Sequence, residues 1–297
     1  MAQNATLNPP APEGLAPPPP APRRRPRRWL AGTLKAIAGL FFVLLALFPL
    51  AWMVIAGFKT KTEVVRTPFQ FFPEVWNTDN YAQILADPVF LRSLGITGLG
   101  AVLFTLLSLA VNSMAAYAFA RLEFQLKRTL WVVVITTMFI PGMTILLTSF
   151  IMVTKLQMLD TLAVLVLPGA AAAIHVFFIR QFYLNIPRSM EEAALIDGCG
   201  RWGVYLRIFL PMSKAPFVVV GVTSFLTFWN SYVWPIMTIT SPELYQIQQY
   251  LAAFRSERSS ELGLLMAGSA LAAAPVVLVF LVFQRQIIAN IKMAGLK

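Results

Sequence analysis

The sequence has very few of the residues on which enzyme active sites and metal centres depend. It contains one histidine, His175, and one cysteine, Cys199, among 297 residues. One cysteine excludes a disulfide within the chain, and one histidine has no second histidine with which to share a metal ion. The phosphate-binding pattern G-x-x-x-x-G-K-[ST] is also missing. We therefore expect no catalytic residues, no metal and no cofactor in this chain.

Charged residues are scarce as well. They make up 12% of the chain, whereas hydrophobic residues make up 58% and the mean hydropathy is +0.68. A soluble domain has about a quarter of its residues charged. The composition therefore predicts an integral membrane protein.

Six long apolar windows without a charged residue run through the sequence. A helix that crosses the hydrocarbon core of a bilayer needs about 20 apolar residues, and these windows are too long and too uniform for the strands of a barrel. The sequence therefore predicts an all-α integral membrane fold with six transmembrane helices. We expect the spans near residues 36–58, 93–120, 129–154, 161–179, 215–240 and 262–284.

The basic residues predict the orientation of these spans. With the N-terminus inside, 17 of the 24 Lys and Arg residues fall in the inner segments and 7 in the outer ones. Cytoplasmic loops collect Lys and Arg, so we expect both termini and the loop at 187–211 in the cytosol. The same rule explains the net charge of +11 without a nucleic-acid partner.

The N-terminal segment differs from the rest of the chain. Residues 1–28 are rich in Pro and Ala and end in a cluster of arginines. Such a segment buries too little apolar surface to fold, so we expect a disordered tail whose basic end contacts anionic lipid headgroups. The transmembrane domain proper is expected over residues 36–297.

The polar loop between the fourth and fifth spans carries helix signals. Ser189 with Glu192 three residues later forms the S-x-x-E pattern of a capping box, which predicts a short helix beginning at Ser189. Gly198 suits the left-handed backbone that ends helices. A second helical run, from Arg201 to Phe209, is expected to stop before Pro211.

The same loop resembles a known signature. Glu192-Ala193-Ala194, Gly198, Ile208 and Leu210-Pro211 stand at the spacing of the EAA pattern of ABC importer permeases. Further stretches, such as 115–121, 228–230 and 263–268, are similar to carbohydrate-type permeases, among them the smaller membrane subunit of the maltose transporter. The resemblance covers roughly residues 36–297.

The resemblance implies a type I ABC importer permease fold with a cytosolic coupling helix between helices 4 and 5. The chain would form half of a pore for a sugar or related polyol in the plasma membrane of a prokaryote. It implies three partners: a cytosolic ABC ATPase dimer that holds the ATP and Mg²⁺, a second homologous permease, and an extracytoplasmic solute-binding protein. The residues expected to contact the ATPase are Glu192, Ala193, Ala194, Asp197, Gly198, Ile208, Leu210 and Pro211.

Aromatic and amide side chains in the fifth span are candidates for the pore. Asn230 and Trp234 would share a helix face, and we group them with Trp229, Tyr232 and, in the second span, Asn112. Packing between helices is an equal alternative for the aromatic residues. For Asn112, a hydrogen bond between helices is the main alternative.

A secondary, ion-coupled transporter is the main rival function. Such proteins usually carry carboxylates within their spans, and the six windows contain none. A membrane enzyme is disfavoured by the lack of catalytic side chains. The substrate stays open among a disaccharide, an oligosaccharide and glycerol phosphate.

Overall fold

The computed structural model describes residues 26–257 and 261–294, and every regular element in these ranges is helical. The chain divides into two units, Met1–Pro49 and Leu50–Lys297, and each is considered by itself. The prediction of a disordered tail lies mostly outside the described residues. Its last three positions, 26–28, belong instead to helix α1 (Pro26–Ala56).

Helix α1 contains the first predicted span. Residues Gly32–Ala56 are long and apolar enough to cross a membrane. The helix ends two residues before the predicted boundary at 58, where Gly57 and Phe58 form a turn. Pro49 lies inside the helix, at the division between the two units.

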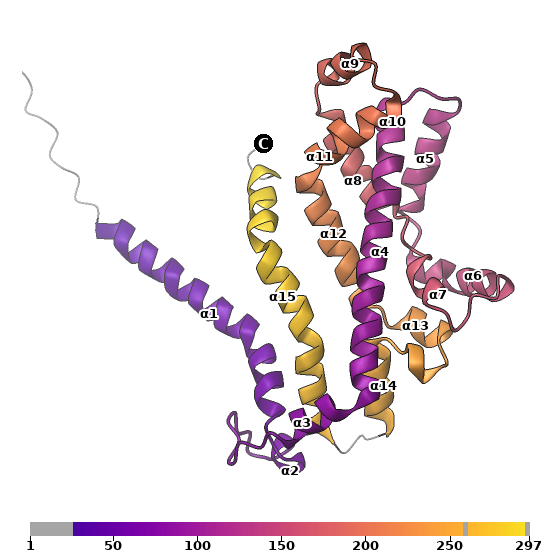
Figure 1. Ribbon diagram of the computed structural model, residues 1–297. Coiled ribbons are helices and arrows are strands. Elements are labelled where there is room, and N and C mark those ends of the chain that lie inside the picture. The colour runs from indigo at the N-terminus through magenta and orange to yellow at the C-terminus, as the bar shows by residue number, and fades with distance from the viewer. Residues whose placement is uncertain (1–25, 258–260, 295–297) are drawn as a thin grey trace, which may run out of the picture. The chain divides into compact units, whose positions relative to one another are not determined.

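The second unit contains the remaining helices, drawn in Figure 1. They are α2 (Lys61–Val64), α3 (Asp79–Ala86), α4 (Pro88–Arg121), α5 (Lys127–Thr137), α6 (Gly142–Lys155), α7 (Leu162–Val166), α8 (Ala173–Leu184), α9 (Arg188–Ile196), α10 (Arg201–Val204), a π-helical turn (Tyr205–Phe209), α11 (Leu210–Met212), α12 (Lys214–Trp229), α13 (Val233–Thr238), a 3₁₀ turn (Pro242–Leu244), α14 (Ile247–Glu257) and α15 (Leu262–Ala294).

Helix α4 is the longest element of this unit and its packing axis. It contacts α8 and α12 extensively and also reaches α7 and α14. Gly100 permits the close approach to α12, because a Cβ atom there would overlap the ring of Phe228. Two buried clusters result, one around Phe104, Phe228 and Trp229 and one around Tyr117, Tyr183 and Phe209.

Only part of the span prediction is matched by single helices. Among the described residues, three helices are long and apolar enough to cross a membrane, or up to five if each bent pair counts as one span. These three are Gly32–Ala56, Pro88–Arg121 and Leu262–Gln286. They contain the first, second and sixth predicted windows, except for two residues of the first.

The third, fourth and fifth windows are interrupted, and a proline stands at or near each break. Helices α5 and α6 bend by 106°, and Pro141 is the N-cap of α6. In the fourth window α7 ends just before Pro168, and the chain becomes helical again at α8. The fifth is split into α12 and α13, with Pro235 in α13. Proline removes a backbone donor, so these windows do not continue as single helices.

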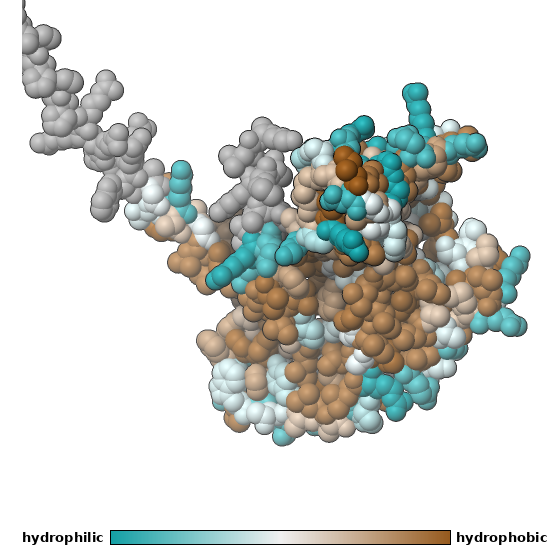
Figure 2. All heavy atoms as spheres, turned by 45° about the horizontal axis from the view of Figure 1, so that its top comes forward, coloured by the Kyte–Doolittle hydropathy of each residue, from teal (hydrophilic) through white to brown (hydrophobic). Residues whose placement is uncertain are grey.

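The surface of the second unit separates by polarity. In Figure 2 brown, hydrophobic side chains fill the middle of the visible face, and teal, hydrophilic ones gather towards the end that carries α9. Exposed hydrophobic side chains of this unit include Leu99, Leu106, Val132, Leu147 and Leu278. Exposed apolar surface of this extent fits a lipid-facing belt.

Asp160, between α6 and α7, joins two connections of the chain. Its carboxylate accepts hydrogen bonds from the amides of Thr240 and Ser241, at 2.7 and 2.9 Å, and from the Thr240 hydroxyl at 2.6 Å. These bonds, the hydroxyl of Thr240 first, lower the pKa of Asp160 to about 2. The α6–α7 connection is thereby tied to the segment that follows α13.

Candidate functional site

The EAA-like loop folds as a short helix followed by a sharp turn. Helix α9 spans Arg188–Ile196, and Gly198 adopts a left-handed φ of +83°, which an L side chain rarely occupies. The turn is closed by hydrogen bonds from the Gly198 and Cys199 amides to the carbonyls of Leu195 and Ala194. The expected helix and its end at Gly198 are therefore present.

The predicted N-cap of this helix is wrong by two residues. Pro187, not Ser189, is the N-cap, and no side chain caps the helix. Proline in an extended conformation already sets the direction of the chain at this point. Ser189 consequently lies within the first turn, and the capping box with Glu192 does not form.

The two neighbouring glutamates of α9 face opposite environments. Glu191 is 7% exposed, whereas Glu192 is exposed. Adjacent residues on a helix point about 100° apart, so only one of them can face the bundle. The sequence pattern indicated Glu192 and gave no sign of Glu191, the residue that anchors the helix.

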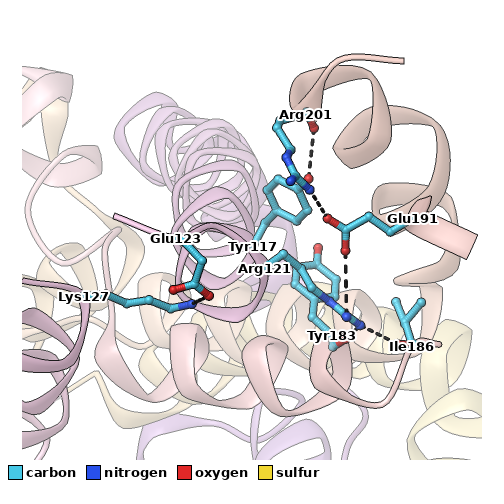
Figure 3. A network of polar contacts seen from close by, with 8 residues as sticks. All are labelled: Tyr117, Arg121, Glu123, Lys127, Tyr183, Ile186, Glu191 and Arg201. Atoms are coloured by element: carbon cyan, nitrogen blue, oxygen red, sulfur yellow. Dashed lines mark hydrogen bonds and ion pairs between the residues drawn. The ribbon is translucent and has the colours of Figure 1, made fainter. Parts of the chain in front are cut away.

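Glu191 lies between two arginines, as Figure 3 shows. One carboxylate oxygen is paired with Arg201, and the other is 3.9 Å from the guanidinium of Arg121. The Arg121 side chain is 5% exposed and belongs to α4. It also donates hydrogen bonds to the carbonyls of Tyr183 and Ile186. A buried carboxylate is thus held by two cations from two different parts of the fold.

Tyrosines strengthen the contact between this loop and α4. The Tyr117 hydroxyl donates to the Arg201 carbonyl at 3.0 Å, and Ser113 and Tyr205 are joined through their hydroxyls at 2.7 Å. The ring of Tyr117 also packs against those of Tyr205 and Phe209. Residues 187–211, which we name the anchored loop, are therefore fixed to the last turns of α4.

The second half of the anchored loop differs from its prediction. The helical run beginning at Arg201 does not stop before Pro211 but passes through a π turn at Tyr205–Phe209 into α11. A π turn inserts one extra residue per turn, and proline is tolerated in the first turn that follows. The chain bends by 79° where Arg201–Met212 meets Lys214–Trp229.

The predicted ATPase-contact residues divide into an outer and an inner group. Glu192, Ala193, Asp197, Gly198 and Pro211 are exposed, and the neighbouring Ile196 is 85% exposed. Ala194, Ile208 and Leu210 are half-buried and pack against the cluster around Tyr117. The first group combines small, apolar and acidic side chains, and Glu192 and Ala193 of α9 are its exposed helical members.

The predicted pore residues of the fifth span do not form one face. The helix ends at Trp229, so Asn230 and Trp234 lie on opposite sides of a break and the expected i, i+4 relation is wrong. Trp229 is buried and donates to the Ala272 carbonyl of α15, whereas Tyr232 is 48% exposed. Of the four, Trp234 lines a cavity, and the Asn230 amide donates back to the Leu226 carbonyl.

Asn112 joins α4 to the connection between α7 and α8. Its amide nitrogen donates to the Ser108 and Ala170 carbonyls, and its oxygen accepts from the Ala172 amide. The residue is fully buried. Asn112 therefore makes hydrogen bonds between segments. A bond of this kind was the main alternative to a role in the pore.

His175 lies close to this junction. Its ring nitrogens are 3.4 Å from the Ser108 hydroxyl and 3.3 Å from that of Thr223. Within the ranges that the structure describes, no group of three His, Cys, Asp or Glu residues is placed to hold a metal ion. Hydroxyl contacts alone account for the position of the histidine.

A bundle of apolar helices with a polar helix fixed at one end has the form of a transporter's membrane subunit, and comparison with known proteins identifies which kind. Residues 112–293 match the family described as "Binding-protein-dependent transport system inner membrane component". The chain belongs to this family. It is a permease subunit of a binding-protein-dependent ABC importer, as the resemblance of its loop and spans predicts.

Two curated relatives extend the similarity over most of the chain. The arabinooligosaccharides transport system permease protein AraQ of Halalkalibacterium halodurans is 30% identical over 89% of this chain and 96% of its own length. The lactose transport system permease protein LacG of Rhizobium radiobacter is 29% identical over 82% of this chain and 89% of its own length.

The fold is also that of a solved transporter subunit. A chain from the crystal structure of a bacterial ABC transporter involved in the import of the acidic polysaccharide alginate superimposes with a TM-score of 0.77. The two chains are 21% identical, over 89% of this chain and 99% of the other. The helical arrangement is therefore an ABC importer permease fold.

Proposed function

We propose that this chain conducts a sugar through half of a two-permease pore and that its anchored loop docks on a cytosolic ATPase. The names of the relatives support the sugar, because they describe transport of arabinooligosaccharides and lactose. The excess of Lys and Arg at the α9 end supports a cytosolic position for that end. Both chain termini would then be cytosolic.

The observation that carries the docking role is the pairing of a buried anchor with an exposed face on one short helix. Glu191 fixes α9 to Arg121, while Glu192 and Ala193 point away into solvent. A helix of two turns is marginal by itself. Anchored in this way, it offers a partner a preformed surface, which lowers the entropic cost of binding.

The same anchor defines how movement would pass into the membrane. Helix α4 has 34 residues and is therefore roughly 50 Å long at 1.5 Å per residue. Its last turn carries Arg121, and the helix contacts α8 and α12. A shift of the anchored loop, driven by ATP and Mg²⁺ in an ATPase dimer, would move α4 and the helices packed on it together.

The proposed assembly has four kinds of subunit. This chain supplies one half of the pore, with six spans, and a second, homologous permease supplies the other half. The ATPase dimer binds on the cytosolic side, and a solute-binding protein delivers the sugar from outside. The family description, which names binding-protein-dependent transport, supports the last of these partners.

A bulky residue on the docking face tests this proposal. Ala193→Trp should abolish ATP-dependent uptake, because the indole would hold the ATPase away from α9. Glu123→Trp is the matched control, since Glu123 is exposed in the neighbouring α4–α5 connection. The assay is uptake of labelled lactose and arabinotriose by cells that carry each variant in place of the native chain.

The outcomes separate the rival functions. Loss of uptake in Ala193→Trp alone, with equal amounts of both variants in the membrane, supports the docking face. Uptake that persists in Ala193→Trp and stops when the ion gradients are collapsed at constant ATP would instead identify an ion-coupled transporter and overturn the proposal.

A further inference from the structure

A cavity opens in the second unit between α4, α6, α7 and the break that separates α12 from α13. Its volume is about 610 Å³, within the range of roughly 300–1,000 Å³ that ligand pockets occupy. Phe104 of α4, Phe228 of α12 and Trp234 of α13 contribute aromatic walls. The cavity therefore lies where the third, fourth and fifth predicted spans are interrupted.

One polar side chain in this cavity has no partner. Gln246, between the 3₁₀ turn and α14, lines the cavity and is 1% exposed. Neither its amide nitrogen nor its amide oxygen has a hydrogen-bond partner. Buried amides are normally paired, so an amide with both a free donor and a free acceptor points to a missing ligand group.

The backbone holds Gln246 firmly in this position. The amide of the next residue, Ile247, donates a hydrogen bond of 2.8 Å to the buried hydroxyl of Thr97 in α4. Trp234 is fixed in the same way, because its indole nitrogen donates to the Val164 carbonyl at 2.8 Å. The backbone beside the unpaired amide and the aromatic wall are therefore held in place.

The other lining groups limit the chemistry of the ligand. The hydroxyl residues Ser149, Thr227 and Ser231 line the cavity, and no charged side chain is among its lining residues in the described part of the chain. Hydroxyls and an amide bind neutral hydroxyl groups, and aromatic rings cover apolar faces. A carboxylated or phosphorylated ligand would have no cation to pair with here.

We propose that this cavity is a binding site for one unit of a neutral sugar, with the Gln246 amide donating to one ring hydroxyl and accepting from another. This inference rests on the proposed function and adds to it a site within this permease subunit. It predicts that uncharged sugars, and not uronates or sugar phosphates, occupy the cavity during transport.

Gln246→Leu tests the proposal, because it keeps the size of the side chain and removes both hydrogen-bonding groups. Gln249→Leu is the matched control. Gln249 is also buried, bonds through its nitrogen to the Ile239 carbonyl and has a free amide oxygen, but it is not among the residues that line the cavity. The readout is the concentration dependence of uptake of labelled lactose and arabinotriose in cells that carry the complete transporter.

Gln246→Leu should raise the half-saturating concentration or lower the uptake rate roughly two- to tenfold, the effect of one or two net hydrogen bonds. Gln249→Leu should leave the half-saturating concentration unchanged. If Gln246→Leu does not reach the membrane, Ser231→Leu takes its place, since it fills the cavity at its wall and should lower uptake.

Normal uptake by both Gln246→Leu and Ser231→Leu would overturn the cavity proposal while leaving the proposed function intact. Equal defects in Gln246→Leu and Gln249→Leu would also overturn it, because they would show that the uptake defect comes from disturbed local packing and not from a lost contact with the sugar. Failure of the native transporter to take up either sugar would instead count against the proposed sugar, and the cavity proposal would fall with it.

Discussion

The two polar sites along α4 differ in whether the buried polar group has a partner. At the α9 end, Glu191 is held between Arg121 and Arg201 (Figure 3). In the cavity, the Gln246 amide has no partner. A paired buried charge fixes one conformation, whereas an unpaired amide has lost its hydration without compensation. The difference agrees with the two roles proposed above, a docking site at the α9 end and a ligand site in the cavity.

The largest loss of stability is expected when Glu191 loses one of its two arginine partners. Arg121→Met leaves Glu191 buried beside a single, exposed arginine, and removing one partner of a buried pair costs about 3–5 kcal/mol. We expect a strongly lowered apparent Tm of the purified protein in detergent. The double variant Arg121→Met with Glu191→Leu should recover much of this loss.

Glu123→Gln provides the control for that experiment. Its ion pair with Lys127 is solvent-exposed on the glutamate side, and such pairs contribute only about 0–1 kcal/mol. A double variant as unstable as Arg121→Met alone would show that the arginine acts through packing rather than through its charge.

A smaller loss is expected at the contact between α4 and α12, nearer the cavity. Gly100→Ala places a methyl group inside the contact distance of the Phe228 ring, and overpacking of this kind costs about 1–3 kcal/mol. Gly98→Ala is the control on the same helix, since a Cβ there has nothing within 4 Å. The Tm should fall for the first variant only, and an equal fall in both would show that the approach of Gly100 to Phe228 is not what limits this position.

The turn of the anchored loop provides the third test. Gly198→Val forces a β-branched residue into a left-handed φ of +83°, at a cost of about 1–2 kcal/mol. The variant should reach the membrane but show low sugar uptake for each ATP hydrolysed. Gly200→Ala, at an ordinary φ of −72°, is the control and should show normal sugar uptake for each ATP hydrolysed. Normal uptake per ATP in Gly198→Val would show that the turn has no part in the proposed docking.

The smallest effect concerns Asp160, between α6 and α7. Its pKa is lowered from 3.8 to about 2 by three hydrogen bonds, so the ionised form stabilises the fold above about pH 4. That stability is lost as the pH falls from 3.8 through about 2. Asp160→Asn should therefore lower the Tm slightly at pH 7, and the gap to the native protein should close towards about pH 2. A gap that does not change with pH would contradict the role of the charge.

Sequence patterns located the family and the continuous helices but not the breaks. The second and sixth windows lie within α4 and α15 because long apolar runs that pack against neighbouring helices continue as helices. The breaks near Pro141 and Pro168 depend on whether neighbouring segments satisfy the freed backbone groups. Asn112, for example, bonds to Ala170 and Ala172, and nothing in the local sequence identifies these partners.

The candidate sites were predictable to different degrees. Gly198 was found because one residue type suits its backbone geometry. Glu191 was missed because its burial depends on Arg121, 70 positions earlier, and only the folded chain brings them together. The cavity at Gln246 had no sequence signal, since a single glutamine in an outer connection has no pattern to distinguish it.

The π turn at Tyr205–Phe209 gives the anchored loop a defined angular setting. It holds one residue more than an α-helical turn would. Deleting one of its five residues would rewind the segment and rotate everything before it by about 100° relative to α12. Glu191 and Arg201 would turn together away from Arg121 of α4, while every residue of this ion-pair network stayed the same. The length of this turn, and not only its composition, therefore sets how the anchored loop is presented for the proposed docking.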